Sequence, residues 1–229
     1  MSYWLRILVL VFLALPLACA SLCPPHVSSR NESVVVLHGL GRSSSSMRRM
    51  ARFLEYSGFS VVNIDYPSRK LSIAELIEHL ERELAKVEFG HPERVHFVGH
   101  SSGGILARAF LAMHPEFPVG RVVLLSPPNQ GSQLAAELKD YAAFHYATGP
   151  LGQELAKSPT SVPTGLPGPS YPLGVIAGDR SVVPPFSWLI PGKDDGIVGV
   201  EEAKDEGMAD FLVVHRAHTW IMNSREVQA

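Results

Sequence analysis

The chain has 229 residues, 46% of them hydrophobic, and a formal net charge of −2 from 20 basic and 22 acidic side chains. This length and composition suit one sizeable hydrophobic core and leave little room for a second. Because the charges nearly balance, there is no sign of a nucleic-acid-binding surface, and we expect no nucleic-acid partner.

The first 20 residues are typical of a secretory signal. An apolar stretch at 7–17 follows Arg6, and Ala18-Cys19-Ala20 fits the small-residue cleavage pattern. Cleavage there predicts an exported protein, periplasmic or secreted, with residues 21–229 forming one domain. The alternative is a retained membrane anchor at 1–20, since the apolar residues around this segment are just long enough to cross a bilayer if Arg6 reaches the headgroups.

Cysteine and histidine patterns predict neither a disulfide nor a metal site. Only Cys23 remains after cleavage, so no internal disulfide can form. The ten histidines are scattered, and neither C-x-x-C nor H-E-x-x-H occurs. We therefore expect no metal and no cofactor. The sequence makes no prediction of the oligomeric state.

Apolar runs alternate with amphipathic stretches along the chain, which predicts a mostly parallel sheet with helices on both faces. The clearest helix follows Ser72 and Glu75, which form a capping box ahead of an apolar stripe. The predicted strands, about six, lie at 33–37, 60–64, 94–98, 121–125, 173–177 and 211–214. The other predicted helices lie at 43–56, 105–114 and 133–146.

This alternation is interrupted by a small insertion at about 127–170, which is rich in proline and contains no predicted strand. Segments of this length inside a compact domain are often lids or binding loops. We expect a cap that contacts the substrate; the alternative is a surface excursion that packs only on itself. The candidate substrate-binding residues are Leu134, Leu138 and Tyr141, with Phe144 and Tyr146 as further wall residues.

Ser101 lies in Gly99-His100-Ser101-Ser102-Gly103, between a predicted strand and a predicted helix. A strand that enters a G-x-S-x-G turn and continues as a helix is typical of a nucleophile elbow, which exposes the serine oxygen at the edge of a sheet. Three further segments follow the order that this interpretation requires: a Gly-rich turn at 37–41, Asp195 in Asp-Gly-Ile-Val, and His218 after the last predicted strand.

These motifs together resemble the α/β-hydrolase superfamily, in particular its small lipases and esterases near the GPI-inositol-deacylase-like branch. The residues that carry the resemblance are Leu-His-Gly-Leu-Gly at 37–41, Gly-His-Ser-Ser-Gly-Gly at 99–104, Pro-Asn-Gln-Gly-Ser at 128–132, Asp-Gly-Ile-Val at 195–198 and His218-Thr219. The resemblance implies a reduced α/β-hydrolase fold and hydrolysis of a small-molecule or lipid ester. It also implies catalytic Ser101, Asp195 and His218, with the N–H groups of Leu40 and Ser102 as the oxyanion hole.

The sequence leaves several alternatives open. Asp179 also follows a predicted strand and Asp194 adjoins Asp195, so either could be the acid. His215 could replace His218, although it falls within the strand run. A thioesterase, an amidase or an acyltransferase would use the same three groups, because all of them pass through an acyl-serine. A non-catalytic scaffold that binds a lipid or a partner is the alternative outside the enzymes.

Overall fold

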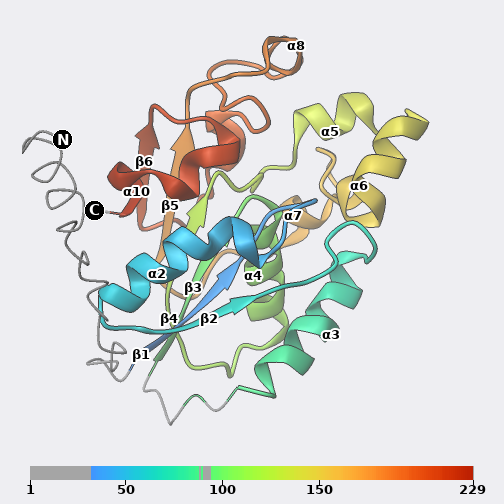
Figure 1. The fold of residues 1–229 in the computed structure, drawn as a ribbon. Coiled ribbons are helices and arrows are strands. Elements are labelled where there is room, and N and C mark those ends of the chain that lie inside the picture. The colour runs from blue at the N-terminus through green and yellow to red at the C-terminus, as the bar shows by residue number, and fades with distance from the viewer. Residues whose placement is uncertain (1–31, 88, 90–93, 229) are drawn as a thin grey trace, which may run out of the picture.

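A computed structural model describes residues 32–87, 89 and 94–228 of the chain. The predicted signal or anchor at 1–20 lies outside the described residues. Within the described part, the chain forms a six-stranded, wholly parallel sheet with helices on both faces (Figure 1). The predicted sheet of about six strands is therefore confirmed.

The strands follow the order β2-β1-β3-β4-β5-β6, so β2 lies on one side of the central β1–β3 pair and β4, β5 and β6 lie on the other. All strands point the same way, and their carboxyl ends meet at one edge of the sheet, where ligands bind in open α/β folds. Their bounds are β1 Glu32–Leu37, β2 Ser60–Ile64, β3 Arg94–His100, β4 Val119–Leu125, β5 Leu173–Gly178 and β6 Asp210–Val214.

Alternate residues of β1 enter two separate cores because successive side chains of a strand point to opposite faces. Val35 and Leu37 join the larger core, and Val34 and Val36 join the smaller one. Burial on both faces explains why this strand reads as a continuous apolar run rather than an alternating one.

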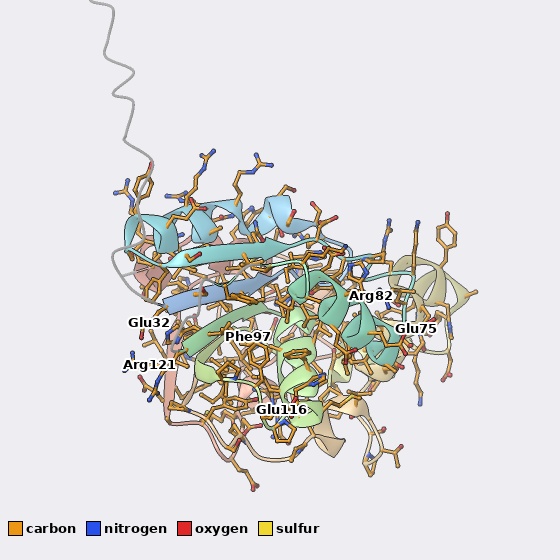
Figure 2. All side chains as sticks on the ribbon, turned by 90° about the horizontal axis from the view of Figure 1, so that it is seen from below. Glu32, Glu75, Arg82, Phe97, Glu116 and Arg121 are labelled. Atoms are coloured by element: carbon orange, nitrogen blue, oxygen red, sulfur yellow. The ribbon has the colours of Figure 1, made fainter. Side chains whose placement is uncertain are left out.

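The larger core is covered by α3 (Ile73–Leu84) and α4 (Ser102–Met113). Figure 2 shows Phe97 inside this layer, whereas Glu75 and Arg82 lie on the outer side of α3. The opposite face carries η1 (Ser44–Met47), α2 (Arg48–Tyr56), η2 (His218–Asn223) and α10 (Arg225–Gln228). The predicted capping box of Ser72 and Glu75 is present at the start of α3.

The 127–170 segment forms α5 (Gln133–Leu138), α6 (Ala142–Glu154) and α7 (Val162–Gly165) near the carboxyl edge of the sheet (Figure 1). The single helix predicted at 133–146 is wrong, because Tyr141 is extended, with φ −88° and ψ 127°, and separates α5 from α6. A kink at Gly149, with φ 65°, then bends α6 ahead of Pro150.

Two short helices complete the edge that carries the predicted site. They are α8 (Pro184–Ser187) and α9 (Val200–Ala203), both between β5 and β6. None of the helices in the described ranges combines the length and the apolar composition that a bilayer crossing requires.

Candidate active site

Ser101 occupies a strained turn between β3 and α4. Its φ of 54° and ψ of −126° are rare for a residue with a side chain, and such outliers concentrate at functional sites. The Ser101 N–H donates to the carbonyl of Leu125 at 2.8 Å, which continues the β3–β4 ladder into the turn. The ladder thus holds Ser101 at the carboxyl edge of the sheet.

Glycines on both sides of Ser101 allow this turn to close. A Cβ at Gly99 would lie 2.6 Å from the Cα of Gly104, and a Cβ at Gly103 would meet the backbone carbonyls of Leu37 and His38. Strand β3, helix α4 and the end of β1 therefore approach each other more closely than any side chain would permit.

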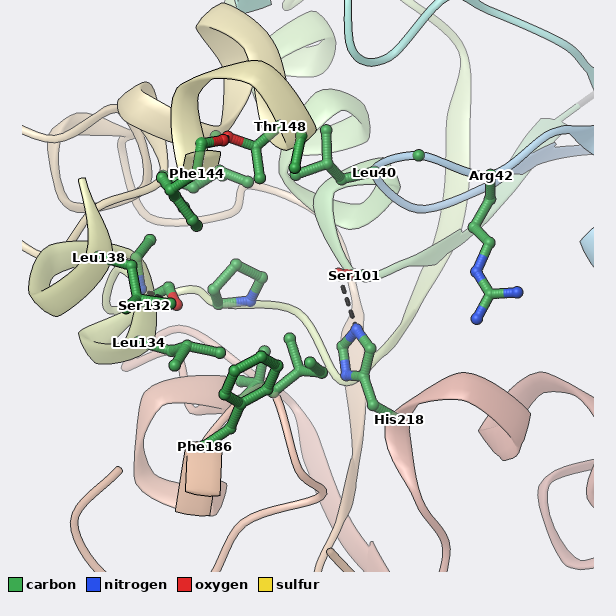
Figure 3. Close-up of a pocket in the computed structure, with 18 of the residues that line it drawn as sticks. Leu40, Arg42, Ser101, Ser132, Leu134, Leu138, Phe144, Thr148, Phe186 and His218 are labelled. Atoms are coloured by element: carbon green, nitrogen blue, oxygen red, sulfur yellow. Dashed lines mark hydrogen bonds between the residues drawn. The ribbon is translucent and has the colours of Figure 1, made fainter. Parts of the chain in front are cut away.

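The structure brings Ser101, His218 and Asp195 together, although Ser101 precedes His218 by 117 residues and Asp195 precedes it by 23. His218 Nε2 lies 3.0 Å from Ser101 Oγ (Figure 3). On the other side of the ring, His218 Nδ1 lies 2.8 Å from Asp195 Oδ2. All three side chains are largely buried. This is the nucleophile, base and orienting acid geometry that acyl transfer requires.

Backbone groups fix the carboxylate of Asp195. Its Oδ1 accepts hydrogen bonds from the N–H groups of Ile197 at 3.1 Å and Val198 at 2.9 Å, which leaves Oδ2 for His218. Burial opposes ionisation of Asp195, but the charge of His218 and hydrogen bonds from His218, Ser126 and Val198 hold its pKa below the ordinary value. The carboxylate is therefore ionised near neutral pH.

The alternative residues pair with each other instead. Asp179 Oδ1 lies 2.9 Å from Nδ1 of His215, which is 74% exposed, and Lys193 Nζ lies 3.4 Å from Asp179 Oδ2. Asp194 is occupied by Ser187 Oγ at 2.6 Å and by the N–H of Gly196 at 2.7 Å. Neither acid is hydrogen-bonded to His218.

A tight turn at Gly39–Arg42 lies beside Ser101, because a Cβ at Gly39 would lie 3.1 Å from the Cβ of Ser101. Arg42 N–H donates to the carbonyl of Gly39 at 3.2 Å, and Gly41 at the third position has φ 68°, as a type II turn requires. Within the described part of the chain, no acceptor is found for the Leu40 N–H. Ser102 is the first residue of α4, so its N–H has no intrahelical acceptor either.

Two buried histidines support this turn and the elbow. Because the N–H of Tyr66 donates to Nε2 of His38, the proton of His38 is on Nδ1, which donates to the carbonyl of Gly39 at 2.9 Å. His100 Nε2 donates to the carbonyl of His218 at 3.0 Å. Burial lowers the pKa of both imidazoles, that of His100 strongly, so both are neutral.

An apolar cavity of about 370 Å³ opens beside Ser101 and His218. Leu134 and Leu138, two of the candidate substrate-binding residues, line it together with the candidate wall residue Phe144 (Figure 3). Tyr141 and Tyr146 do not line it; they are 63% and 93% exposed. The break between α5 and α6 turns Tyr141 outward, which a continuous helix would not have done.

Sequence reasoning missed three residues of the site. Ser126 has φ 46°, and its hydroxyl accepts from the N–H of Gly178 at 3.3 Å and reaches Asp195. It directly follows β4, and this position at the same edge as Ser101 was the signal that could have identified it. Phe186 and Arg42 line the cavity from segments whose sequences carried no such signal. No group of histidine, cysteine or acidic side chains in the described residues is arranged to hold a metal ion.

The fold and this site define a hydrolase of the α/β type. The model of the alpha/beta hydrolase family matches residues 34–221, most of the chain, and the chain belongs to this family. The predicted α/β-hydrolase fold is therefore confirmed.

Curated relatives include lysosomal thioesterases. The chain is 34% identical over 132 residues to the lysosomal thioesterase PPT2 homolog of Drosophila melanogaster, covering 56% of this chain and 44% of that protein. It is 29% identical over 229 aligned residues to lysosomal thioesterase PPT2 of Rattus norvegicus, covering 86% of this chain and 73% of that protein. The expected GPI-inositol-deacylase-like branch is not what these relatives represent.

Solved structures of lipases share the fold. The mature lipase BlEst2 of Bacillus licheniformis superposes with a TM-score of 0.68 and 21% identity, covering 83% of this chain and 86% of that chain. Phospholipase PlaB of Legionella pneumophila superposes with a TM-score of 0.66 and 16% identity, covering 84% of this chain and 55% of that chain.

Proposed function

We propose that the protein is a serine hydrolase that cleaves carboxylic esters of apolar acyl groups through an acyl-enzyme on Ser101. The observation that carries this proposal is the chain of hydrogen bonds from Ser101 Oγ through His218 to Asp195, with distances of 3.0 and 2.8 Å. A serine hydroxyl is a weak nucleophile at neutral pH unless an adjacent base accepts its proton.

In the proposed mechanism, Ser101 Oγ attacks the acyl carbon while His218 Nε2 takes its proton. The carboxylate of Asp195 holds the tautomer that leaves Nε2 free and stabilises the imidazolium. The N–H groups of Leu40 and Ser102 donate to the oxyanion, each contributing about 3–4 kcal/mol when well aligned. His218 then protonates the leaving group and activates the water that releases the acid.

The cavity supports an apolar acyl group. Two hydroxyls on its wall already have partners within the protein: Ser132 Oγ accepts from the N–H of Ala135 at 3.1 Å, and Thr148 Oγ1 donates to the carbonyl of Phe144 at 2.7 Å. The part of the wall formed by these residues and by Leu134, Leu138 and Phe144 therefore favours hydrocarbon over a polar substituent.

A thioester is the second candidate substrate, because the curated relatives are thioesterases. Both reactions pass through the same acyl-serine and differ only in the leaving atom. Residues 1–20 predict export, and lysosomal proteins such as the curated relatives also enter the secretory pathway. We therefore propose that the enzyme acts outside the cytosol.

The test uses the chain without residues 1–20, assayed on 4-nitrophenyl esters from acetate to palmitate and on matching acyl thioesters with thiol detection. We expect turnover by the wild type, and Ser101→Ala should lower kcat by at least about 10³-fold with an unchanged circular dichroism spectrum. Equal turnover by this variant would contradict the proposal, and inertness of the wild type on every acyl compound would favour a binding scaffold.

A further inference from the structure

Arg42 is the one formally charged residue among the described residues that line the cavity beside Ser101. The remaining lining residues are apolar, small or neutral, and their hydroxyls on the cap side are already hydrogen-bonded. Arg42 is exposed, and within the part of the chain that the structure describes it forms no ion pair. A cation without a protein partner on a mostly apolar cavity is available to bind an anion of the substrate.

The position of Arg42 divides the site into two halves. Figure 3 shows its guanidinium on one side of Ser101 and His218, while Leu138 and Phe144 lie on the other. If the acyl chain enters the apolar half, the leaving group must extend toward the half that carries Arg42. His218, which protonates the leaving group, lies between the two halves.

The charge of Arg42 acts on a buried residue of the site, and further arginines follow it in the chain. It acts on the buried imidazole of His100, where it contributes to the lowered pKa, after burial and the nearby His218. Residues 40–54 contain four arginines and no acidic residue. Figure 2 shows long nitrogen-tipped side chains projecting from α2, which follows Arg42 in the chain. The carboxylate of Asp65 accepts from the N–H of Ser44 at 2.7 Å and offsets one of these charges, so the segment keeps a net positive charge that attracts anions.

We propose that Arg42 binds an anionic group on the leaving half of the substrate, so that the enzyme selects acyl esters or thioesters whose alcohol or thiol carries a phosphate or a carboxylate. A guanidinium suits this role because its planar donors match either anion with two parallel hydrogen bonds. This inference rests on the proposed acyl-hydrolase function and adds a preference for one substrate class.

Matched substrates test the inference. The octanoyl esters of 2-nitrophenol and of 3-hydroxy-4-nitrobenzoate differ by one carboxylate, and S-octanoyl pantetheine and S-octanoyl 4′-phosphopantetheine differ by one phosphate. We expect the wild type to favour the anionic member of at least one pair in kcat/KM. Arg42→Gln should reduce the anionic-to-neutral ratio about fivefold or more through KM, and Arg42→Lys should restore part of it. The pair that responds identifies the anion.

Arg49→Gln is the control, because Arg49 is exposed on the same segment but does not line the cavity. The inference is overturned if Arg42→Gln changes both members of each pair equally, or if Arg49→Gln changes the ratio as much. Failure of the wild type to cleave any of the four substrates would instead refute the acyl-hydrolase function on which the inference rests. The melting temperatures of the variants should match that of the wild type.

Discussion

The backbone N–H of His218 donates a 3.0 Å hydrogen bond to the carbonyl of Asp195, the residue whose carboxylate also accepts from the ring of the same histidine at 2.8 Å. Asp195 and His218 are thus joined by one backbone hydrogen bond and one side-chain hydrogen bond. This double link fixes the ring orientation without relying on side-chain packing alone, which is how a precise site is built on rigid elements.

Exchange of the acid tests this arrangement. Asp195→Asn should lower kcat by about 10⁴-fold, because an amide at this position no longer favours the tautomer in which His218 Nε2 is the base. Asp179→Asn is the matched control, since Asp179 pairs with the exposed His215. Steady-state kinetics on one ester decide between them, and a larger loss in the Asp179 variant would make that residue the acid.

The close packing at the elbow predicts that alanine destabilises the protein far more at Gly99 than at Gly174. Gly99→Ala should lower the free energy of unfolding by about 1–3 kcal/mol, because its Cβ would lie 2.6 Å from backbone that cannot move aside cheaply. Gly174→Ala in β5 meets no atom within 4 Å and should change stability by less than about 0.5 kcal/mol. Urea titrations of both variants provide the measurement. Equal losses would mean that the elbow can relax.

The cavity wall predicts the acyl preference. Leu138→Trp places a larger side chain into the cavity and should shift the preferred acyl chain to shorter lengths, seen in kcat/KM across the 4-nitrophenyl ester series. Lys139→Trp adds the same side chain at the next, exposed position and should leave the profile in place. An unchanged profile in the Leu138 variant would place the acyl chain elsewhere.

Glu202 predicts a pH effect on stability. Burial raises its pKa even though its carboxylate accepts from the N–H groups of Gly199 and Gln133, at 2.9 and 2.8 Å. The stability gained from its bound proton is fully present below the unfolded pKa of about 4.3 and is lost as the pH rises through the folded value.

The glutamine of Glu202→Gln cannot ionise, so the variant should become more stable relative to the wild type as the pH rises from 4 to 8. The exposed neighbour Glu201→Gln is the control. Urea titrations at each pH give the free energies of unfolding of the variant and the wild type. A difference between them that stays constant across this pH range would contradict the assigned pKa direction.

Local structure and distant contacts of this chain differ in how far its sequence predicts them. Local patterns determined the strands, the elbow glycines around Ser101 and the capping box of Ser72, because periodicity and backbone sterics act over a few residues. The break at Tyr141 escaped this reading, since the apolar spacing of 133–146 also fits one unbroken helix. Propensity alone does not reveal where packing interrupts a helix.

The sequence by itself determined the α/β-hydrolase class and the chain order of Ser101, Asp195 and His218. Only the tertiary structure decided which acid contacts which histidine, that Tyr141 faces solvent, and that Arg42 lies at the cavity. The physical reason is that these relationships join segments far apart in the chain. Their meeting depends on the strand order and on the loops at one sheet edge, and neither leaves a periodic signal in the sequence.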